Sequence, residues 1–215
     1  MSRLGYFIFA WIAACVPLAH AESVIEGVVQ LPSALAAAVT PSRYQNKIAG
    51  HLGPPDPPLA VVYLEGNFPA PVNTNALARM EQNHFQFSPG LLAIQTGTAV
   101  EFPNMDPGYH SVFSYSKSKR FDLGRYRKDE KPPIQIFDKP GVVKLYCEIH
   151  EHMRGTILVL DTPYFVKTDV TGKYLLEHLP AGKYTLKVWV DEKHVWERPV
   201  ELTGASHLHE DFPRK

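Results

Sequence analysis

The sequence predicts an all-β chain. Its 215 residues include 19 prolines and 14 glycines, which indicates many turns. Short runs rich in β-branched and aromatic residues lie between these turns, and long helical patterns of alanine, leucine and glutamate are scarce. A hydrophobic content of 45% is ordinary for a chain that buries a core, and the length suits one large domain or two small ones.

The strands expected in the first three quarters of the chain are short and end at Gly, Pro or Asp turns. They cover residues 23–31, 59–65, 84–87, 91–95, 98–102, 111–115, 141–146 and 156–160. Residues 34–39 have room for a turn or two of helix between Pro32 and Pro41. Residues 116–131 are polar and basic, and we interpret them as a solvated surface segment.

After Pro163 the strands are separated by turns at hairpin spacing. The turns are expected at 168–172 and 179–182, and a longer alternating strand follows at 184–190. This pattern predicts a small β-sandwich-like unit at 163–215, after a larger unit at 22–162. No long linker follows Leu160, so the two units are expected to pack together.

Residues 1–21 are typical of an export signal. Arg3 supplies a positive charge, residues 4–18 are apolar, and Ala19-His20-Ala21 is a small-x-small cleavage site. The alternatives are a membrane anchor, for which the run is short, and lipoprotein processing at Cys15. Cleavage after Ala21 would leave a periplasmic chain with no spanning segment and a single cysteine, Cys147.

The charge balance argues against a nucleic-acid partner. Lys plus Arg and Asp plus Glu each number 22, so the formal net charge is zero. No basic stripe of the kind that follows a phosphate backbone is visible.

A cluster of metal-binding residue types lies between the last two strands of the larger unit. Cys147, His150 and Met153 follow the spacing Cys-x2-His-x2-Met. Thiolate and thioether are soft ligands and imidazole is intermediate, so this set suits copper. A second imidazole must come from elsewhere, and His110 is the best candidate because it lies where a loop enters another strand.

Other interpretations of these residues remain open. His152 competes with His150, although Met153 follows His152 too closely for it to fit well. The loop as a whole could also be a buried structural cysteine with surface histidines. His207 and His209, near the C-terminus, are a weaker candidate for metal binding.

The residues around these donors resemble the cupredoxins, the blue-copper proteins. The resemblance rests on Phe102-Pro103-Asn104, His110-Ser111-Val112 and Tyr146-Cys147-x2-His150-x2-Met153-x-Gly155, and the short ligand loop is similar to that of amicyanin. It implies a Greek-key sandwich that holds one copper ion cycling between Cu(I) and Cu(II). His110, Cys147 and His150 would lie in the trigonal plane, with Met153 axial.

A narrower resemblance covers about residues 24–186. Phe121-Asp122-Leu123-Gly124-Arg125-Tyr126 and the ligand loop are similar to exported proteins labelled "methylamine utilization protein". The stretch 168–184 is similar to carboxypeptidase regulatory-like or Cna-B-like modules. The label records a genomic association and does not establish a role.

Two positions next to the expected ligands differ from the cupredoxin pattern. Ser111 stands where the family usually has an asparagine that ties the two ligand segments together, and its hydroxyl offers fewer hydrogen bonds. Glu151 stands where amicyanin-like loops have proline, beside the edge through which electrons would pass. Together with Asn104, these residues are expected to surround the ligands.

The resemblance implies a non-enzymatic electron carrier. Its partners would be redox proteins, such as a cytochrome or a periplasmic dehydrogenase. Four protein donors leave no open position for a substrate, and no acid–base pair stands out. The alternatives are a periplasmic copper-handling protein with no electron-carrier role, a copper enzyme with a second histidine-rich site, and a structural binding module.

Overall fold

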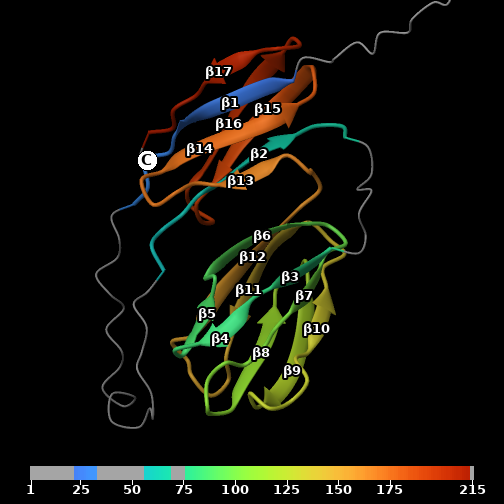
Figure 1. Ribbon diagram of the computed structural model, residues 1–215, viewed down its shortest axis with the longest axis vertical. Helices are drawn as coiled ribbons and strands as arrows, with labels where there is room; N and C mark the ends of the chain where they lie inside the picture. The colour runs from blue at the N-terminus through green and yellow to red at the C-terminus, as the bar shows by residue number, and fades with distance from the viewer. Residues whose placement is uncertain (1–21, 33–55, 69–75, 214–215) are drawn as a thin grey trace, which may run out of the picture.

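Every regular element in the described part of the chain is a β-strand, which confirms the all-β prediction. The computed structural model describes residues 22–32, 56–68 and 76–213, which form seventeen strands in five sheets (Figure 1). Within these residues no helix is long and apolar enough to cross a membrane. The expected export signal at 1–21, with Cys15, and the expected helical turns at 34–39 lie outside the described residues.

Strands β3 to β12 form one sandwich, which we call the insert unit. Its large sheet has the order β6-β12-β11-β8-β9, and its small sheet has the order β10-β7-β3, with a separate β4-β5 hairpin. The strands are β3 (Leu77–Arg79), β4 (Glu81–Asn83), β5 (Gln86–Ser88), β6 (Leu91–Gln95), β7 (Ala99–Glu101), β8 (His110–Tyr115), β9 (Arg120–Tyr126), β10 (Ile134–Ile136), β11 (Gly141–Tyr146) and β12 (Arg154–Leu160).

The core of the insert unit follows from strand alternation. Val143 and Leu145 of β11 are fully buried, and the same inward face continues to Cys147, just past the end of the strand. On β8, His110 and Val112 are fully buried as well. The period of two therefore directs a cysteine and a histidine into the same apolar interior.

The remaining seven strands form a second sandwich, which we call the framing unit. Its sheets have the orders β14-β1-β17 and β13-β2-β15-β16, and one apolar core lies between them. The strands are β1 (Ser23–Val28), β2 (Val61–Glu65), β13 (Phe165–Lys167), β14 (Lys173–Leu179), β15 (Gly182–Trp189), β16 (Val195–Leu202) and β17 (His207–His209).

Strand pairing corrects the predicted position of the first two strands. The sequence analysis assigned them to the larger unit at 22–162, but β1 pairs with β14 and β17, and β2 pairs with β13 and β15. The physical reason is that β2 fills the gap between β13 and β15, while β1 supplies the central strand of the other sheet. The insert unit is therefore nested in sequence between two parts of the framing unit.

A small apolar cluster joins the two units, as the short connection after Leu160 predicted. Leu158 and Leu160 of β12 pack with Val61 of β2 and Trp189 of β15. The Lys144 ammonium lies 5.7 Å from the Trp189 ring centroid, which adds a cation–π contact. Figure 1 shows β6 and β12 facing β13 across this contact.

The nested arrangement predicts that β1 stabilises the framing unit. Ile25 is fully buried in that unit's core, so Ile25→Ala should lower its free energy of unfolding by about 2–5 kcal/mol. Denaturant titration followed by tryptophan fluorescence measures this, because Trp189 and Trp196 lie in β15 and β16. Leu175→Ala is the control, since Leu175 of β14 is 43% exposed. An equal loss of unfolding free energy in Ile25→Ala and Leu175→Ala would contradict the assignment of β1 to the framing unit.

Candidate metal centre

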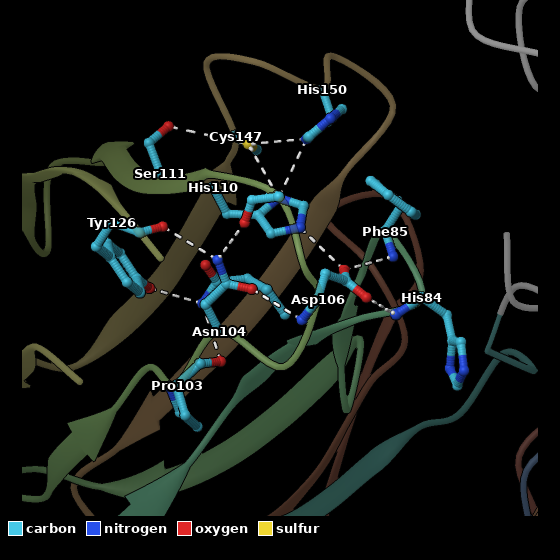
Figure 2. Close-up of polar contacts among 12 residues, drawn as sticks. His84, Phe85, Pro103, Asn104, Asp106, His110, Ser111, Tyr126, Cys147 and His150 are labelled. Carbon is cyan, nitrogen blue, oxygen red and sulfur yellow. Dashed lines mark hydrogen bonds and ion pairs between the residues drawn. The ribbon is translucent and has the colours of Figure 1, made fainter. Parts of the chain in front are cut away.

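Three of the predicted ligands meet at one end of the insert unit. The Cys147 Sγ atom lies 3.8 Å from His110 Nδ1 and 3.7 Å from His150 Nδ1, and the two imidazole nitrogens are 3.1 Å apart (Figure 2). His110 is fully buried, Cys147 is 3% exposed, and His150 is partly exposed. Among the described residues, these three form the group whose ligand atoms could share a metal ion.

The sheet explains why these residues meet although 40 positions separate His110 from His150. Strands β8 and β11 are neighbours, with Tyr146 paired to Phe113. His110 begins β8, and Cys147 follows the last residue of β11 at the same end of the sheet. The chain then turns through 147–153 into β12, and the turn is closed by the Met153 amide donating to the His150 carbonyl at 2.9 Å.

The donor separations fit a single metal ion. A metal about 2.0 Å from each nitrogen and about 2.3 Å from sulfur gives separations of about 3.5–3.7 Å in a trigonal plane. The three separations of 3.1, 3.7 and 3.8 Å are close to these values. Met153 is 1% exposed and belongs to the same core cluster as Cys147. Its role as axial ligand stays a prediction.

Electrostatics favour the thiolate form of Cys147, which is the form that binds metals. Burial raises the pKa of the thiol, but hydrogen bonds with His110 and His150 outweigh burial and lower the pKa to about 5. The pKa of His110 moves the other way: burial lowers it, and the contacts with Asp106 and Cys147 together raise it.

Asp106 is a functional residue that the sequence analysis missed. Its carboxylate lies 2.9 Å from His110 Nε2, on the far side of the ring from Cys147. A carboxylate that accepts the Nε2 proton leaves Nδ1 as the ligand atom, because each neutral imidazole carries a single N–H. Burial raises the pKa of Asp106, but bonds from His110, Phe85 and His84 together lower it. The signal for Asp106 was its place in Asn104-x-Asp106-x3-His110, between two residues that the sequence already assigned to the centre.

Asp106 also holds a strained turn between β4 and β5. His84 and Phe85 both have left-handed φ values, 52° and 58°, which cost energy in residues other than glycine. The two carboxylate oxygens of Asp106 accept the amides of His84 and Phe85 at 2.8 and 2.9 Å. These bonds offset part of the strain and fix the turn relative to His110.

The strained turn places an aromatic ring over the imidazoles. The Phe85 centroid lies 5.6 Å from that of His110 and 5.1 Å from that of His150, both in edge-to-face geometry. The hairpin approaches β12 closely at Gly155, where a Cβ atom would lie 3.1 Å from the Phe87 Cβ. Phe85 is 5% exposed, so its ring shields the donors from water.

Of the residues predicted to surround the ligands, Asn104 ties the loop before His110 to β9, and Ser111 joins the two ligand segments. Asn104 donates to the Gly108 and Tyr126 carbonyls at 2.8 and 3.0 Å and accepts the Asp106 amide at 2.9 Å. The Ser111 hydroxyl accepts the Glu148 amide at 2.8 Å and donates toward Cys147 Sγ at 3.9 Å. Serine therefore ties the two segments together in this chain.

His152 and Glu151 lie outside the group of donors. His152 Nε2 faces the Phe85 carbonyl at 3.1 Å, and its ring centroid is 6.1 Å from that of His150. Burial and the neighbouring His150 lower the pKa of His152. Glu151 is exposed. Nearby, Glu148 forms a bidentate ion pair with Arg125, with nitrogen–oxygen distances of 3.0 and 2.9 Å.

Comparison with known proteins finds partial structural matches to copper proteins. No known family profile and no curated protein matches the sequence. A copper-containing nitrite reductase from Thermus scotoductus SA-01 aligns over 40% of this chain and 22% of its own, with 27% identity and a TM-score of 0.38. A purple cupredoxin from Nitrosopumilus maritimus aligns over 39% of this chain and 99% of its own, with 24% identity and a TM-score of 0.35. The reduced state of a mutant of amicyanin aligns over 41% of this chain and 86% of its own, with 21% identity and a TM-score of 0.36.

The contacts of Asp106 predict that its replacement strongly destabilises the insert unit. Asp106→Ala should lower the free energy of unfolding of the metal-free insert unit by about 3 kcal/mol or more, because hydrogen bonds to a buried charge are worth about 1.5–3 kcal/mol each. Hydrogen exchange of the β8 and β11 amides measures the effect. Asp138→Ala is the control: its carboxylate is 59% exposed and pairs with Lys119, so the cost should stay below about 1 kcal/mol. If Asp106→Ala also lowered the free energy of unfolding by less than about 1 kcal/mol, the turn would not depend on this carboxylate.

Proposed function

We propose that this chain is an exported, periplasmic copper protein that carries single electrons between redox partners. One copper ion would be held by His110, Cys147, His150 and Met153. The observation that supports this most directly is the convergence of a thiol and two imidazole Nδ1 atoms within 3.8 Å of one another, next to a buried thioether. Two imidazoles, a thiolate and a weak thioether are the donor set of electron-transfer copper sites.

Copper bound to these donors would supply a one-electron Cu(I)/Cu(II) couple. The residues of this chain provide rigidity. His110 stands at the start of a paired strand with Asp106 behind its ring, and Ser111 ties the Cys147 segment to β8. Donors that cannot rearrange keep the same geometry in both oxidation states, which favours fast electron transfer.

His150 is the proposed route for the electron. His110 is fully buried and Cys147 is 3% exposed, whereas His150 is partly exposed. Exposed Glu151 and the Arg125–Glu148 ion pair lie around this edge of the centre. Charges at the rim of such a contact select partners and affect association rate more than affinity. The partner would be another redox protein of the same compartment, such as a cytochrome or a periplasmic dehydrogenase.

A catalytic role is less well supported by the same donors. With the four proposed protein ligands, an ion would have no position for a substrate, and the Phe85 ring covers the imidazoles at centroid distances of 5.1 and 5.6 Å. The centre is thus suited to passing electrons and not to binding small molecules. We therefore propose a carrier and not an enzyme.

The first test is the spectrum of the purified protein after addition of Cu(II). We expect an intense visible charge-transfer band and narrow copper hyperfine splitting in electron paramagnetic resonance, because the Cys147 thiolate bonds covalently to copper. Cys147→Ser should abolish the band. A pale spectrum with wide splitting in the unmodified protein would instead favour copper handling, and a band that survives Cys147→Ser would overturn the assignment of this cysteine.

A second test concerns the axial ligand. Met153→Gln should lower the reduction potential and keep copper bound, because an amide oxygen is a stronger axial ligand for Cu(II) than a thioether. Protein-film voltammetry measures the shift. Met105→Gln is a matched control in the Asn104–His110 loop, where the Met105 sulfur lies 3.8 Å from an Arg79 guanidinium nitrogen. An unchanged or higher potential for Met153→Gln would show that Met153 is not axial.

A further inference from the structure

The outer face of the large sheet in the insert unit is only partly covered. Val142 of β11 and Leu158 of β12 lie on this face and pack in the apolar cluster that joins the two units. Strand alternation places Tyr146 and Arg154 on the same face, at the other end of the two strands. Neither residue is part of the joining cluster, so the face continues beyond the contact with the framing unit.

Three aromatic rings form a continuous strip on the uncovered part of this face. The Tyr146 ring centroid lies 5.7 Å from that of Phe113, which lies 5.3 Å from that of Tyr115. Phe113 and Tyr146 are partners across β8 and β11, and Tyr115 is two positions further along β8. Tyr115 is 69% exposed, more than any other large apolar side chain in the described part of the chain. The strip is therefore accessible from solvent.

An arginine lies over each end of this strip. The Arg120 guanidinium carbon is 5.2 Å from the Tyr115 ring centroid, and that of Arg154 is 5.6 Å from the Tyr146 ring centroid. Both arginines are exposed, and neither forms an ion pair with any residue that the structure describes. Together with Phe113, these four residues form what we call the arginine–aromatic row.

The charges around the row leave it positive. Two ion pairs border it, Lys144–Glu192 and Arg125–Glu148, and each pair is neutral in sum. Asp122 of β9 also lies on this side, and its carboxylate accepts the backbone amide two positions later at 2.9 Å. The two guanidiniums at the ends of the row therefore outnumber this single carboxylate, and the row attracts negative charge.

We propose that the arginine–aromatic row is a docking surface for an acidic segment of another protein. A guanidinium that stacks on a ring keeps the N–H groups at its edge free, where it can hold a carboxylate with two parallel hydrogen bonds. Tyrosine and arginine are also enriched among the residues that contribute most to protein–protein binding energy. Carboxylates of the partner would pair with Arg120 and Arg154, and its apolar groups would cover the three rings.

The spacing of the strands sets the length of that segment. The row crosses the neighbouring strands β9, β8, β11 and β12, so its ends are separated by three interstrand gaps, or about 14 Å. An extended chain rises about 3.3 Å per residue, so about five residues reach from one guanidinium to the other. The row includes none of the proposed copper ligands, and the docking surface does not depend on the electron-carrier role.

Single-stranded nucleic acid is another anionic polymer that aromatic rings and arginines bind. Proteins that bind it follow the phosphate backbone with many cations, whereas this chain has a formal net charge of zero. The row has unpaired cations at its two ends and apolar rings between them, which suits carboxylates spaced along a peptide. An acidic protein segment is therefore the favoured occupant.

Arg127 offers a matched control on the same strand edge. Its guanidinium carbon lies 5.5 Å from the ring centroid of Tyr109, which is 51% exposed. Unlike the arginines of the row, Arg127 already has an acidic neighbour, because its Nε atom lies 3.6 Å from the Asp129 carboxylate. Arg127→Gln therefore removes the same charge and the same kind of ring contact at a place where no docking is proposed.

The experiment is a titration of fluorescently labelled hexaglutamate with the full chain, followed by anisotropy at low ionic strength without added metal. Arg120→Gln and Arg154→Gln should each raise the Kd about two- to fivefold, because each removes one exposed ion pair. The double substitution should raise the Kd about tenfold, and Arg127→Gln should change it by less than about 1.5-fold. Circular dichroism checks that each variant keeps its strands.

Nuclear magnetic resonance of the unmodified protein locates the bound peptide without any substitution. We expect hexaglutamate to shift the amide signals of Phe113, Tyr115 and Tyr146 more than those of the β4–β5 hairpin. Added salt should reverse these shifts, because the pairing charges are exposed and are screened by ions.

Three results would overturn the proposal. The first is that hexaglutamate does not bind, or binds without shifting the amides of the row. The second is that Arg127→Gln weakens binding as much as Arg120→Gln and Arg154→Gln, which would show only a general attraction between charges. The third is that a thymidine hexanucleotide binds more tightly than hexaglutamate, which would assign the row to nucleic acid.

Discussion

The rest of the candidate centre depends on two interactions of the Asp106 carboxylate. It accepts the two backbone amides of a left-handed turn, and it lies against the Nε2 atom of His110. The turn is unfavourable for His84 and Phe85 without such a partner. The ligand His110 and the shielding ring of Phe85 are therefore positioned by the same buried group, and neither can move without disturbing the other.

A second set of contacts fixes the cysteine side of the centre. Ser111 lies next to His110 on β8, and its hydroxyl bridges to the Glu148 amide beside Cys147. Antiparallel pairing between β8 and β11 brings these segments together, and the hydroxyl extends that pairing by one bond beyond the last strand residues. The ligand set thus depends on sheet register. A slip of one residue in either strand would turn Cys147 or His110 to the opposite face.

Local patterns in the sequence predicted much of the structure, and contacts between distant residues account for what they missed. Alternation and turn residues predicted the strands around Cys147, and donor chemistry predicted that His110 would join Cys147 and His150. The role of Asp106 was not predictable in this way, because its partners His84 and Phe85 meet it only after the hairpin folds over. The partners of β1 and β2 were missed for the same reason: strand pairing across more than a hundred residues leaves no local pattern.

The nesting of the insert unit also sets the order in which the chain can fold. Because the chain is synthesised from its N-terminus, β1 and β2 are made long before β14, β15 and β17, the strands that complete their sheets. Residues 77–160, by contrast, contain all the partners of their own strands and can close first. Until the last strands arrive, the edges of β1 and β2 lack these partners and are open to pairing with other chains. The unit that carries the candidate metal centre would thus fold early, and the framing unit could be completed only after its C-terminal strands are made.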